Sequence, residues 1–458
     1  MSRTPSPFDE HVQEQCDLIR LLLVTVRHFW GGFASLWQNV TDPRQQTHIT
    51  YPLSALLTTG LLMFLFRLAA RRQVTLMLRH NQPACATFET LFGVETWPHG
   101  DTLNATYARL SVPELQEAVT ASVERLIRMK VLYPYRLLGR YFLVAIDGTG
   151  MLTFPERHCP HCMTMTHHGH TTYYHPVLEA KLVTHTGLAC SLMTEFIENP
   201  DQYLTKQDCE LKAFYRLADR LKQRFPRLPL CLLLDGLFAG GPTFSICNQS
   251  GWKFIIVLQE GSLPTLQEDF EALLPLCPAN HLRFRPADLY LAVQDFTWIS
   301  DLTYSDSDHL THTLTVIRCL ETKPTAKPEP HSTRFKWITN LPVTAANVIE
   351  LANRGGRLRW KIENEGFNVQ KNGGYALEHI YSHHPVSAKI FYLLLQLAHT
   401  LAQLIERGSL LRQAFPASLG SARNLAWRLL EAWRNLPCGA QLIDSLLKTP
   451  VQIRLRPP

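Results

Sequence analysis

Two aspartates occupy the same kind of position in the sequence, at the end of a short and almost wholly apolar run. Asp147 closes the apolar part of YFLVAIDGTG (141–150), and Asp235 closes that of LPLCLLLDG (228–236). Apolar runs of this length are typical of buried strands. Open α/β sheets form their ligand crevice at the carboxyl ends of such strands. If the two strands are neighbours, both carboxylates face one crevice.

A third carboxylate lies much later, in RGGRLRWKIENEGFNVQKNGG (354–374), where we expect a helix over about 356–371. Arg359 and Glu363 are four residues apart and share one helix face, and Lys371 lies two turns further along that side. Basic residues that flank an acid in this way can hold phosphates beside a metal-bound carboxylate. The alternative is an ordinary surface ion pair, because i,i+4 charge pairs are common on helices.

Together the three acids have the composition of a two-metal site. Mg²⁺ prefers carboxylate oxygens, keeps several waters, and binds through few protein ligands together with substrate phosphate. Two ions about 3.5–4 Å apart can activate a water or a 3′-hydroxyl and stabilise the departing oxygen of an in-line displacement. We predict that Asp147 bridges two Mg²⁺ ions and that Asp235 and Glu363 each complete one site.

The elements that must position these residues change along the chain. Up to about residue 136 the apolar spacing is helical, without strand-like alternation. The order that follows is three strands, a helix, a strand, a short crossover and another strand, which implies a mixed sheet covered on both faces. We place the strands at 141–150, on both sides of a tight turn at Gly187 within 178–197, at 228–236 and at 252–258, and the helix at 206–225.

Beyond residue 262 the helical pattern disappears, and β-branched and aromatic residues alternate partially. We expect strands at 289–302, 312–321 and 335–342, with a Pro/Lys-rich loop at 323–330, and then helices at 344–354, 356–371 and 387–406. The chain is therefore divided into a helical N-terminal domain (1–136), the first part of an α/β core (137–261), a β-rich insertion (262–343), core helices with the third acid (344–406) and a helical C-terminal region (407–458).

The stretches that carry the acids resemble those of DDE transposases of bacterial insertion sequences, which have an RNase H-like core interrupted by a β-rich insertion before the final acid. The resemblance covers about residues 45–405. It rests on VAIDGTG with Asp147, TKQDCELKA at 205–213, LLLDGLFAG with Asp235, FKWITNLP, and RLRWKIENEGFNVQK with Glu363.

The last stretch fits the family register only in part. In many relatives it reads Tyr, two residues, Arg, three residues, Glu, six residues, Lys. Arg359 and Glu363 keep this spacing, whereas Gly356 occupies the Tyr position and Gln370 the Lys position, with Lys371 one residue later. Glu365 is the rival third acid, but its register would place Lys361 where Arg belongs. We therefore prefer Glu363.

The resemblance implies Mg²⁺-dependent cleavage at transposon ends, followed by attack of the freed 3′-hydroxyl on target DNA. Arg359 and Lys371 would contact phosphates, and Arg357 and Lys361 belong to the same basic cluster. Some relatives flip a base into the insertion, where an aromatic side chain stacks on it. Our candidate is Trp298, and the alternative is that Trp298 packs the core of the insertion.

The partners implied are double-stranded DNA, as terminal repeats and as target, and a second copy of the chain, because relatives generally act as dimers on paired DNA ends. The N-terminal domain would bind the transposon end. The implied location is the prokaryotic cytoplasm, at the nucleoid. A non-catalytic, transposase-derived DNA-binding protein is the alternative function, which would be expected to have lost an acid; all three are present.

A separate group of metal-ligating residues lies in HCPHCMTMTHHGHTTYYH (158–175). Cys159 and Cys162 form a CxxC pair that four histidines follow, and thiolate and imidazole suit tetrahedral Zn²⁺. With His168 and His170 they are our candidate ligands for a structural Zn²⁺ that pins this excursion. The alternatives are a His-rich loop near DNA and a site that acquires metal only on a metal resin.

Two further acids, Asp208 and Glu210, open the helix after the third strand. We interpret them as helix-capping residues in preference to catalytic ones, because acids near a helix N-terminus complement its dipole.

Composition excludes other classes. With 46% apolar and 18% charged residues the chain is neither disordered nor a collagen-like repeat, and its net charge of +6 is compatible with a polyanionic partner. Eleven mostly isolated cysteines favour a reducing compartment, and the polar N-terminus does not resemble a signal peptide.

The uncharged stretch 45–66 is dense in apolar residues only over 52–66, which is too short for a helix that spans a membrane. We expect a buried helix there instead of a membrane-associated protein.

Overall fold

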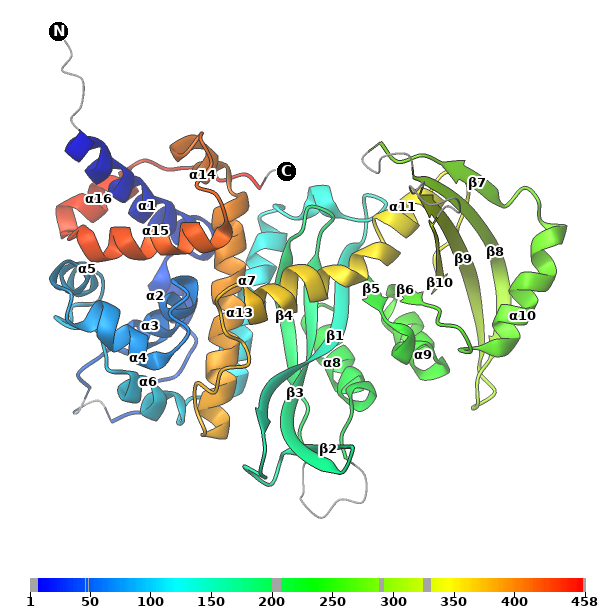
Figure 1. Ribbon diagram of the computed structural model, residues 1–458, viewed down its shortest axis with the longest axis horizontal. Coiled ribbons are helices and arrows are strands. Elements are labelled where there is room, and N and C mark those ends of the chain that lie inside the picture. The colour runs from blue at the N-terminus through cyan, green and yellow to red at the C-terminus, as the bar shows by residue number, and fades with distance from the viewer. Residues whose placement is uncertain are drawn as a thin grey trace, which may run out of the picture.

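The computed structural model describes residues 7–45, 47, 49–199, 207–287, 292–323 and 331–455. It is a mixed α/β structure in which a ten-stranded mixed sheet is flanked by helices (Figure 1). Residues 205 and 206 of the quoted stretch TKQDCELKA, the start of the predicted strand 289–302 and almost all of the predicted loop 323–330 lie outside the described residues.

The first part of the chain is helical, as expected, and its helices gather at one end of the molecule (Figure 1). They are α1 (Pro7–Trp30), α2 (Phe33–Trp37), α3 (Leu53–Leu65), α4 (Arg71–Val74), α5 (Gln82–Phe92), α6 (Gly100–Tyr107) and α7 (Val112–Arg128). Helix α3 is the uncharged segment, and it is buried along almost its whole length. At Gly60 it approaches α13 (Pro385–Arg407) so closely that a Cβ would lie 2.7 Å from Leu394 Cδ1.

Helices near the C-terminus return to this helical end and pack on it. They are α14 (Ser409–Ala414), α15 (Ala422–Asn435) and α16 (Ala440–Lys448), of which α15 and α16 contact α1. Within the described residues α13 alone is long and apolar enough to cross a membrane, and 94% of its apolar stretch is buried inside the protein. Burial of this kind is also what the core helix of a globular protein requires.

The α/β core contributes six strands to the sheet. They are β1 (Phe142–Phe154), β2 (Met163–His167), β3 (His170–Val183), β4 (Ala189–Phe196), β5 (Leu230–Leu234) and β6 (Lys253–Val257), of which β2 forms a hairpin with β3 that lengthens one end. Strand β3 lies antiparallel between β1 and β4, whereas β1, β5 and β6 are parallel neighbours. Gly187 has φ +90° in the turn between β3 and β4, so the predicted tight turn is present.

The insertion extends this same sheet. Its strands are β7 (His281–Phe284), β8 (Val293–Ser305), β9 (Thr311–Lys323) and β10 (His331–Thr339), and β10 pairs with core strand β6. The prediction that helices are absent here is wrong, because α10 (Pro264–Leu273) precedes the strands. A proline in its first turn and the buried Leu266 and Phe270, four residues apart, are ordinary helix signals.

The sheet has two apolar faces in the region of β1 and β5. On one face Leu143, Ala145 and Leu233 pack with Leu358 and Ile362 from the segment that carries the third acid. The other face is covered by α8 (Glu210–Arg224), whose Phe214 and Leu217 belong to the larger core cluster. Side chains alternate between these two faces along each strand. Whether Asp147 or Asp235 points to one face or the other therefore depends on its position in the strand.

The helix predicted over 356–371 is present, but its helix type changes along its length. After α11 (Val348–Asn353) come a 3₁₀-helix (Gly356–Trp360), a π-helical turn (Ile362–Phe367) and α12 (Asn368–Asn372). Gly356 lies so close to the buried Trp337 that a Cβ would be 2.5 Å from its indole Nε1. The narrow 3₁₀-helix lies against that ring, and the wider π-helical turn follows it. The segment is therefore not one regular α-helix. Such π-turns are frequent at functional sites.

Candidate metal-binding carboxylate site

Arg359 joins two of the predicted acids. Its Nη1 lies 3.3 Å from Asp147 Oδ2, and its Nη2 donates to Glu363 Oε1 at 2.8 Å. The guanidinium is 7% exposed, the Asp147 carboxylate 16% and the Glu363 carboxylate 35%. The fold thus brings residues from β1 and from the π-helical turn into one partly buried cluster that opens to solvent on the Glu363 side.

Asp235 reaches the same end of the sheet through strand register. Ala145 of β1 and Leu233 of β5 are paired in parallel, and each aspartate follows its partnered residue by two positions. Residues two apart in an extended chain point to the same face, and the backbone of Asp235 is extended, with φ −83° and ψ 178°. Because neighbouring strands lie about 4.8 Å apart, the backbones of Asp147 and Asp235 lie at neighbouring positions of β1 and β5. The carboxylate oxygens of Asp147, Asp235 and Glu363 do not all lie within 4.8 Å of one another.

Local hydrogen bonds hold both aspartates in place. The backbone N–H of Gly148 donates to Asp147 Oδ1 at 2.9 Å, and that of Leu237 donates to Asp235 Oδ1 at 2.9 Å. The second contact starts the 3₁₀-helix Gly236–Phe238. In each case one carboxylate oxygen is tied to the backbone, which orients the carboxylate.

The protonation of Asp147 reflects this crowding. Burial raises the pKa of Asp147 to about 7, and the hydrogen bond and negative charge of Glu363 act in the same direction. The Arg359 guanidinium opposes them. A divalent cation placed between the two carboxylates would favour their ionised forms, because an opposite charge at short range stabilises the charged state.

A fourth carboxylate, Glu210, approaches from the other face of the sheet. Gly148 has no side chain there, and a Cβ on it would lie 2.1 Å from Glu210 Oε1. Burial raises the pKa of Glu210, and the charge of Asp235 adds to this effect. Glu210 also lies in the first turn of α8, where the sequence predicts a helix-capping acid. Its approach to Gly148 has no signal in the local sequence, because it lies fourteen positions beyond the end of β4 at Phe196.

Asp208, the other acid of that pair, has a different environment. Its carboxylate binds Arg216 Nη2 at 2.7 Å and is 6% exposed. The ion pair ties the start of α8 to the helix's own second turn, which agrees with a structural role.

The other predicted basic residues do not contact the acid cluster. Arg357 binds Glu321 at 2.6 Å, Lys361 binds Glu365 at 2.8 Å, and Lys371 binds Glu378 at 2.8 Å. Arg359 is therefore the basic residue of this segment that the structure places against the acids. Arg357, Lys361 and Lys371 could contact a phosphate only outside the cluster of acids around Arg359.

The rival acid, Glu365, faces another part of the fold. A Cβ on Gly187, in the turn after β3, would lie 3.5 Å from Glu365 Cδ. That turn lies beyond the Val144–Leu182 end of the β1–β3 ladder, whereas Asp147 pairs with Glu179 three residues further along β1. Glu363, in contrast, shares Arg359 with Asp147. The geometry therefore favours Glu363 as the third acid, as expected.

The position that holds Lys in many DDE relatives is buried here. Gln370 donates to Gln396 Oε1 at 2.8 Å and lies 2.9 Å from His399 Nδ1, both on α13. Gln370 therefore belongs to a buried polar network with α13.

The prediction for Trp298 is wrong. Its side chain is 3% exposed and packs with Phe296, Ile317 and Trp337 in the core on this face of the sheet. Strand alternation on β8 turns it inward, so it is not available to stack on a base.

An exposed aromatic ring does lie beside Arg359. Trp360 is 51% exposed, and the Arg359 guanidinium is 4.5 Å from its ring centroid.

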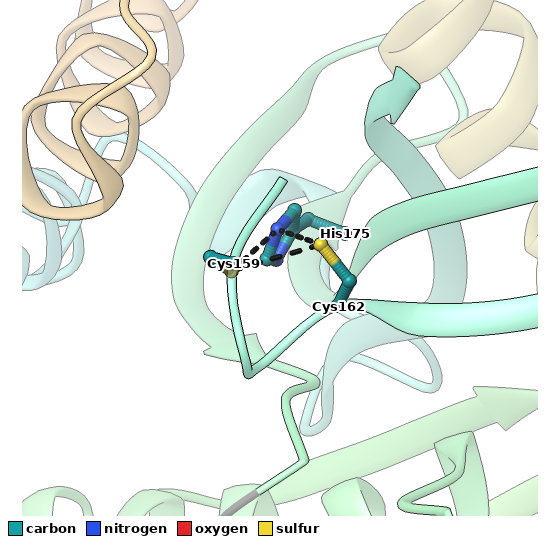
Figure 2. A group of neighbouring side chains, drawn as sticks. All are labelled: Cys159, Cys162 and His175. Carbon is teal, nitrogen blue, oxygen red and sulfur yellow. Dashed lines mark hydrogen bonds between the residues drawn. The ribbon is translucent and has the colours of Figure 1, made fainter. Parts of the chain in front are cut away.

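The Cys/His segment forms a separate cluster, shown in Figure 2. Cys159 and Cys162 converge on His175 of β3, and their ligand atoms all lie within 4.8 Å of one another. The prediction of His168 and His170 as ligands is wrong. His168 and Gly169 have positive φ values in the two-residue turn between β2 and β3, so His168 and His170 are exposed at the hairpin tip.

In comparisons with known proteins, no protein-family model matches the chain and no curated protein matches it.

The oxygen donors of the carboxylate cluster around Arg359 are of the chemical type that binds a hard divalent cation. Asp147, Asp235 and Glu363 offer carboxylate oxygens, the donors that Mg²⁺ prefers. Among the described residues, however, only Cys159, Cys162 and His175 form a set of three His, Cys, Asp or Glu side chains whose ligand atoms lie within 4.8 Å of one another.

Proposed function

We propose that this protein is a DDE transposase, an Mg²⁺-dependent enzyme that cleaves DNA strands at transposon ends and joins them to target DNA. The observation that carries the proposal is the convergence of Asp147 and Glu363 on Arg359, with Asp235 at the neighbouring strand end. In an isolated surface ion pair Arg359 would bind Glu363 alone, whereas here it also reaches Asp147 of β1, next to the end of β5.

The arrangement of the core strands supports an RNase H-like fold. The order β4-β3-β1-β5-β6 puts the first strand of the core in the centre, with antiparallel neighbours on one side and parallel ones on the other. The acids lie where β1 and β5 run side by side, at the carboxyl end of β5, which is the usual place for a ligand site in an open sheet.

Asp147, Asp235 and Glu363 would hold two Mg²⁺ ions, which activate the attacking oxygen and stabilise the departing one. The backbone N–H groups of Gly148 and Leu237 keep the two aspartates oriented. When its carboxylates are engaged by cations, the Arg359 guanidinium is available to bind a DNA phosphate with two parallel hydrogen bonds.

The exposed Trp360 ring beside Arg359 is suited to stack on an unpaired base near the cleaved strand. Trp360 would then stack on the base, which is the role that the sequence suggested for Trp298 of the insertion. We further propose double-stranded DNA as the partner, a homodimer as the active form, and the prokaryotic nucleoid as the location.

The test is cleavage, with Mg²⁺ present, of double-stranded DNA that carries the ends of the encoding element. Asp147→Asn, Asp235→Asn and Glu363→Gln should each reduce cleavage by at least about 100-fold, while DNA binding is retained. Glu365→Gln is the matched control, because this acid lies two residues from Glu363 and pairs with Lys361. Cleavage that persists in any of the three variants would remove that acid from the site.

The alternative is a DNA-binding protein without catalysis, and one observation favours it. Arg359 already neutralises Asp147 and Glu363, so the cluster satisfies its charges without a cation. Calorimetric titration with Mg²⁺ separates the two functions. An absence of Mg²⁺ binding, together with DNA binding and no cleavage, would favour the alternative.

A further inference from the structure

Cys159, Cys162 and His175 have the mutual spacing of ligands around one tetrahedral ion. The Sγ atoms are 3.6 Å apart, and His175 Nε2 lies 3.4 Å from Cys159 Sγ and 3.3 Å from Cys162 Sγ. Zn–S bonds of about 2.3 Å and Zn–N bonds of about 2.0 Å at tetrahedral angles give S–S near ~3.8 Å and S–N near ~3.5 Å. The observed distances are therefore close to those expected for three ligands of one tetrahedral zinc ion.

The loop that presents the thiols is fixed by its neighbours. Asn199 Nδ2 donates to the carbonyl of Cys162 at 3.0 Å, and the Asn199 carbonyl lies 2.7 Å from His161 Nδ1. Cys162 is fully buried and His175 is 6% exposed. The C-terminal end of the CxxC segment is thus held against the segment after β4, which fixes the position of the Cys162 thiol.

A carboxylate lies behind the imidazole. His175 Nδ1 is 3.9 Å from Glu198 Oε1, and the other oxygen of Glu198 accepts a hydrogen bond from Lys389 of α13 at 2.6 Å. A proton on Nδ1 facing a carboxylate leaves the lone pair on Nε2 directed at the thiols. Metal-bound histidines usually have such a partner for the second ring nitrogen.

We propose that Cys159, Cys162 and His175 bind one Zn²⁺ ion, with Glu198 as the positioning residue behind the histidine. Soft thiolates with an imidazole select Zn²⁺ over Mg²⁺, so this site is chemically distinct from the carboxylate site. The described residues supply three ligands, and water or one further group would complete the tetrahedron.

The place of this site in the fold gives it a role. His175 pairs with Leu152 on the same β1–β3 ladder that carries Asp147. Through Glu198 and Lys389 the cluster is also connected to α13. A bound ion would fix the β2–β3 hairpin relative to the strand that carries the first acid.

The experiment uses full-length protein purified without a polyhistidine tag or metal resin. Elemental analysis should give about one zinc per chain, and replacement by Co²⁺ should give the intense visible and thiolate charge-transfer bands of tetrahedral coordination. Cys159→Ser with Cys162→Ser, and separately His175→Ala, should lose both signals. The matched controls are His168→Ala with His170→Ala, at the exposed hairpin tip, and Cys209→Ser, an exposed thiol; both should keep them.

Glu198→Gln should bind zinc about 10–100-fold more weakly in competition with a chelator. If the cysteine variant does not fold, Co²⁺ titration of chelator-treated wild-type protein still reports the thiolate ligands. Zinc retained by His175→Ala, a Cys159–Cys162 disulfide in freshly purified protein, or an absence of Zn²⁺ and Co²⁺ uptake would each overturn the proposal. These readouts do not depend on DNA cleavage, so they are independent of the proposed transposase activity.

Discussion

At the scale of single residues, Arg359 determines the charge balance of the candidate site. It is the counter-ion for two carboxylates that are otherwise crowded together, and all three groups are at least partly withdrawn from solvent. Removing one partner from such a cluster leaves like charges facing each other without compensation. A divalent cation can supply the same compensation.

Arg359→Gln is therefore expected to lower the free energy of unfolding in EDTA, on the order of 1–2 kcal/mol. Added Mg²⁺ should raise the melting temperature more in this variant than in the wild-type protein, because the guanidinium no longer competes for the carboxylates. Thermal melts with EDTA and with Mg²⁺ measure both effects. Arg357→Gln, which loses contacts with Glu321, Cys319 and the Phe335 ring that lie away from the two acids, is the control and should show no added response to Mg²⁺.

Glu210 gives a second prediction at this scale. Glu210→Gln removes a negative charge close to Asp235 and beside Gly148, so Mg²⁺ affinity should fall about 3- to 10-fold. Isothermal titration with Mg²⁺ measures this change. Equal affinity in variant and wild type would show that Glu210 serves only the N-terminus of α8.

At the scale of elements, the irregular segment after α11 depends on a close approach between backbone and ring. Gly356→Ala places a methyl group against the rigid, buried Trp337 indole, so we expect a loss of about 1–3 kcal/mol in the free energy of unfolding. Chemical denaturation measures it. Gly439→Ala is the control: it precedes α16 at φ −72°, with nothing within 4 Å of the new Cβ. A neutral Gly356→Ala would contradict the packing explanation.

Helix α13 carries a buried histidine that gives stability a pH dependence. Burial, with the charges of Lys181 and Arg67, holds the pKa of His399 well below 6.5, and its Nδ1 contacts Gln370. Below about pH 6.5 the unfolded chain binds a proton at this residue and the folded chain does not. Unfolding is then favoured, so the free energy of unfolding should fall as the pH falls.

His399→Asn keeps an acceptor near the Nδ1 position and cannot take up the proton. Its free energy of unfolding should therefore decrease less than that of the wild type between pH 7 and pH 5. Urea denaturation across this range measures the difference. His309→Asn, at an exposed position, is the control; a slope identical to wild type for His399→Asn would exclude His399 as the source.

At the scale of the whole molecule, the two ends of the chain form one helical body beside the sheet (Figure 1). Arg27 of α1 donates to the carbonyl of Leu447 in α16 at 2.9 Å, and α15 packs along α1. The fully buried Trp433 of α15 contacts Phe66 and Trp97 from the N-terminal part. The C-terminal region is therefore part of the N-terminal core.

Deletion of residues 408–458 should expose that core and lower the melting temperature by at least about 5 °C, with aggregation on heating. Circular dichroism and light scattering measure both. Trp427→Ser, which alters an exposed ring on the same helix α15, should leave the melting temperature unchanged. A truncated chain with wild-type stability would show that the C-terminal helices are an independent appendage.

The sequence by itself determined the local features. Apolar runs marked β1, β5 and β6, the i,i+4 spacing identified the Arg359–Glu363 pair, and the uncharged stretch gave a buried helix, because burial and periodicity leave a local pattern. Only the tertiary structure decided which side chains meet. It turned Trp298 into the core, replaced His168 and His170 by His175, made the helix that begins at Gly356 irregular, and brought Glu210 against Gly148. These outcomes depend on strand register and on contacts between distant segments, for which the chain carries no local signal.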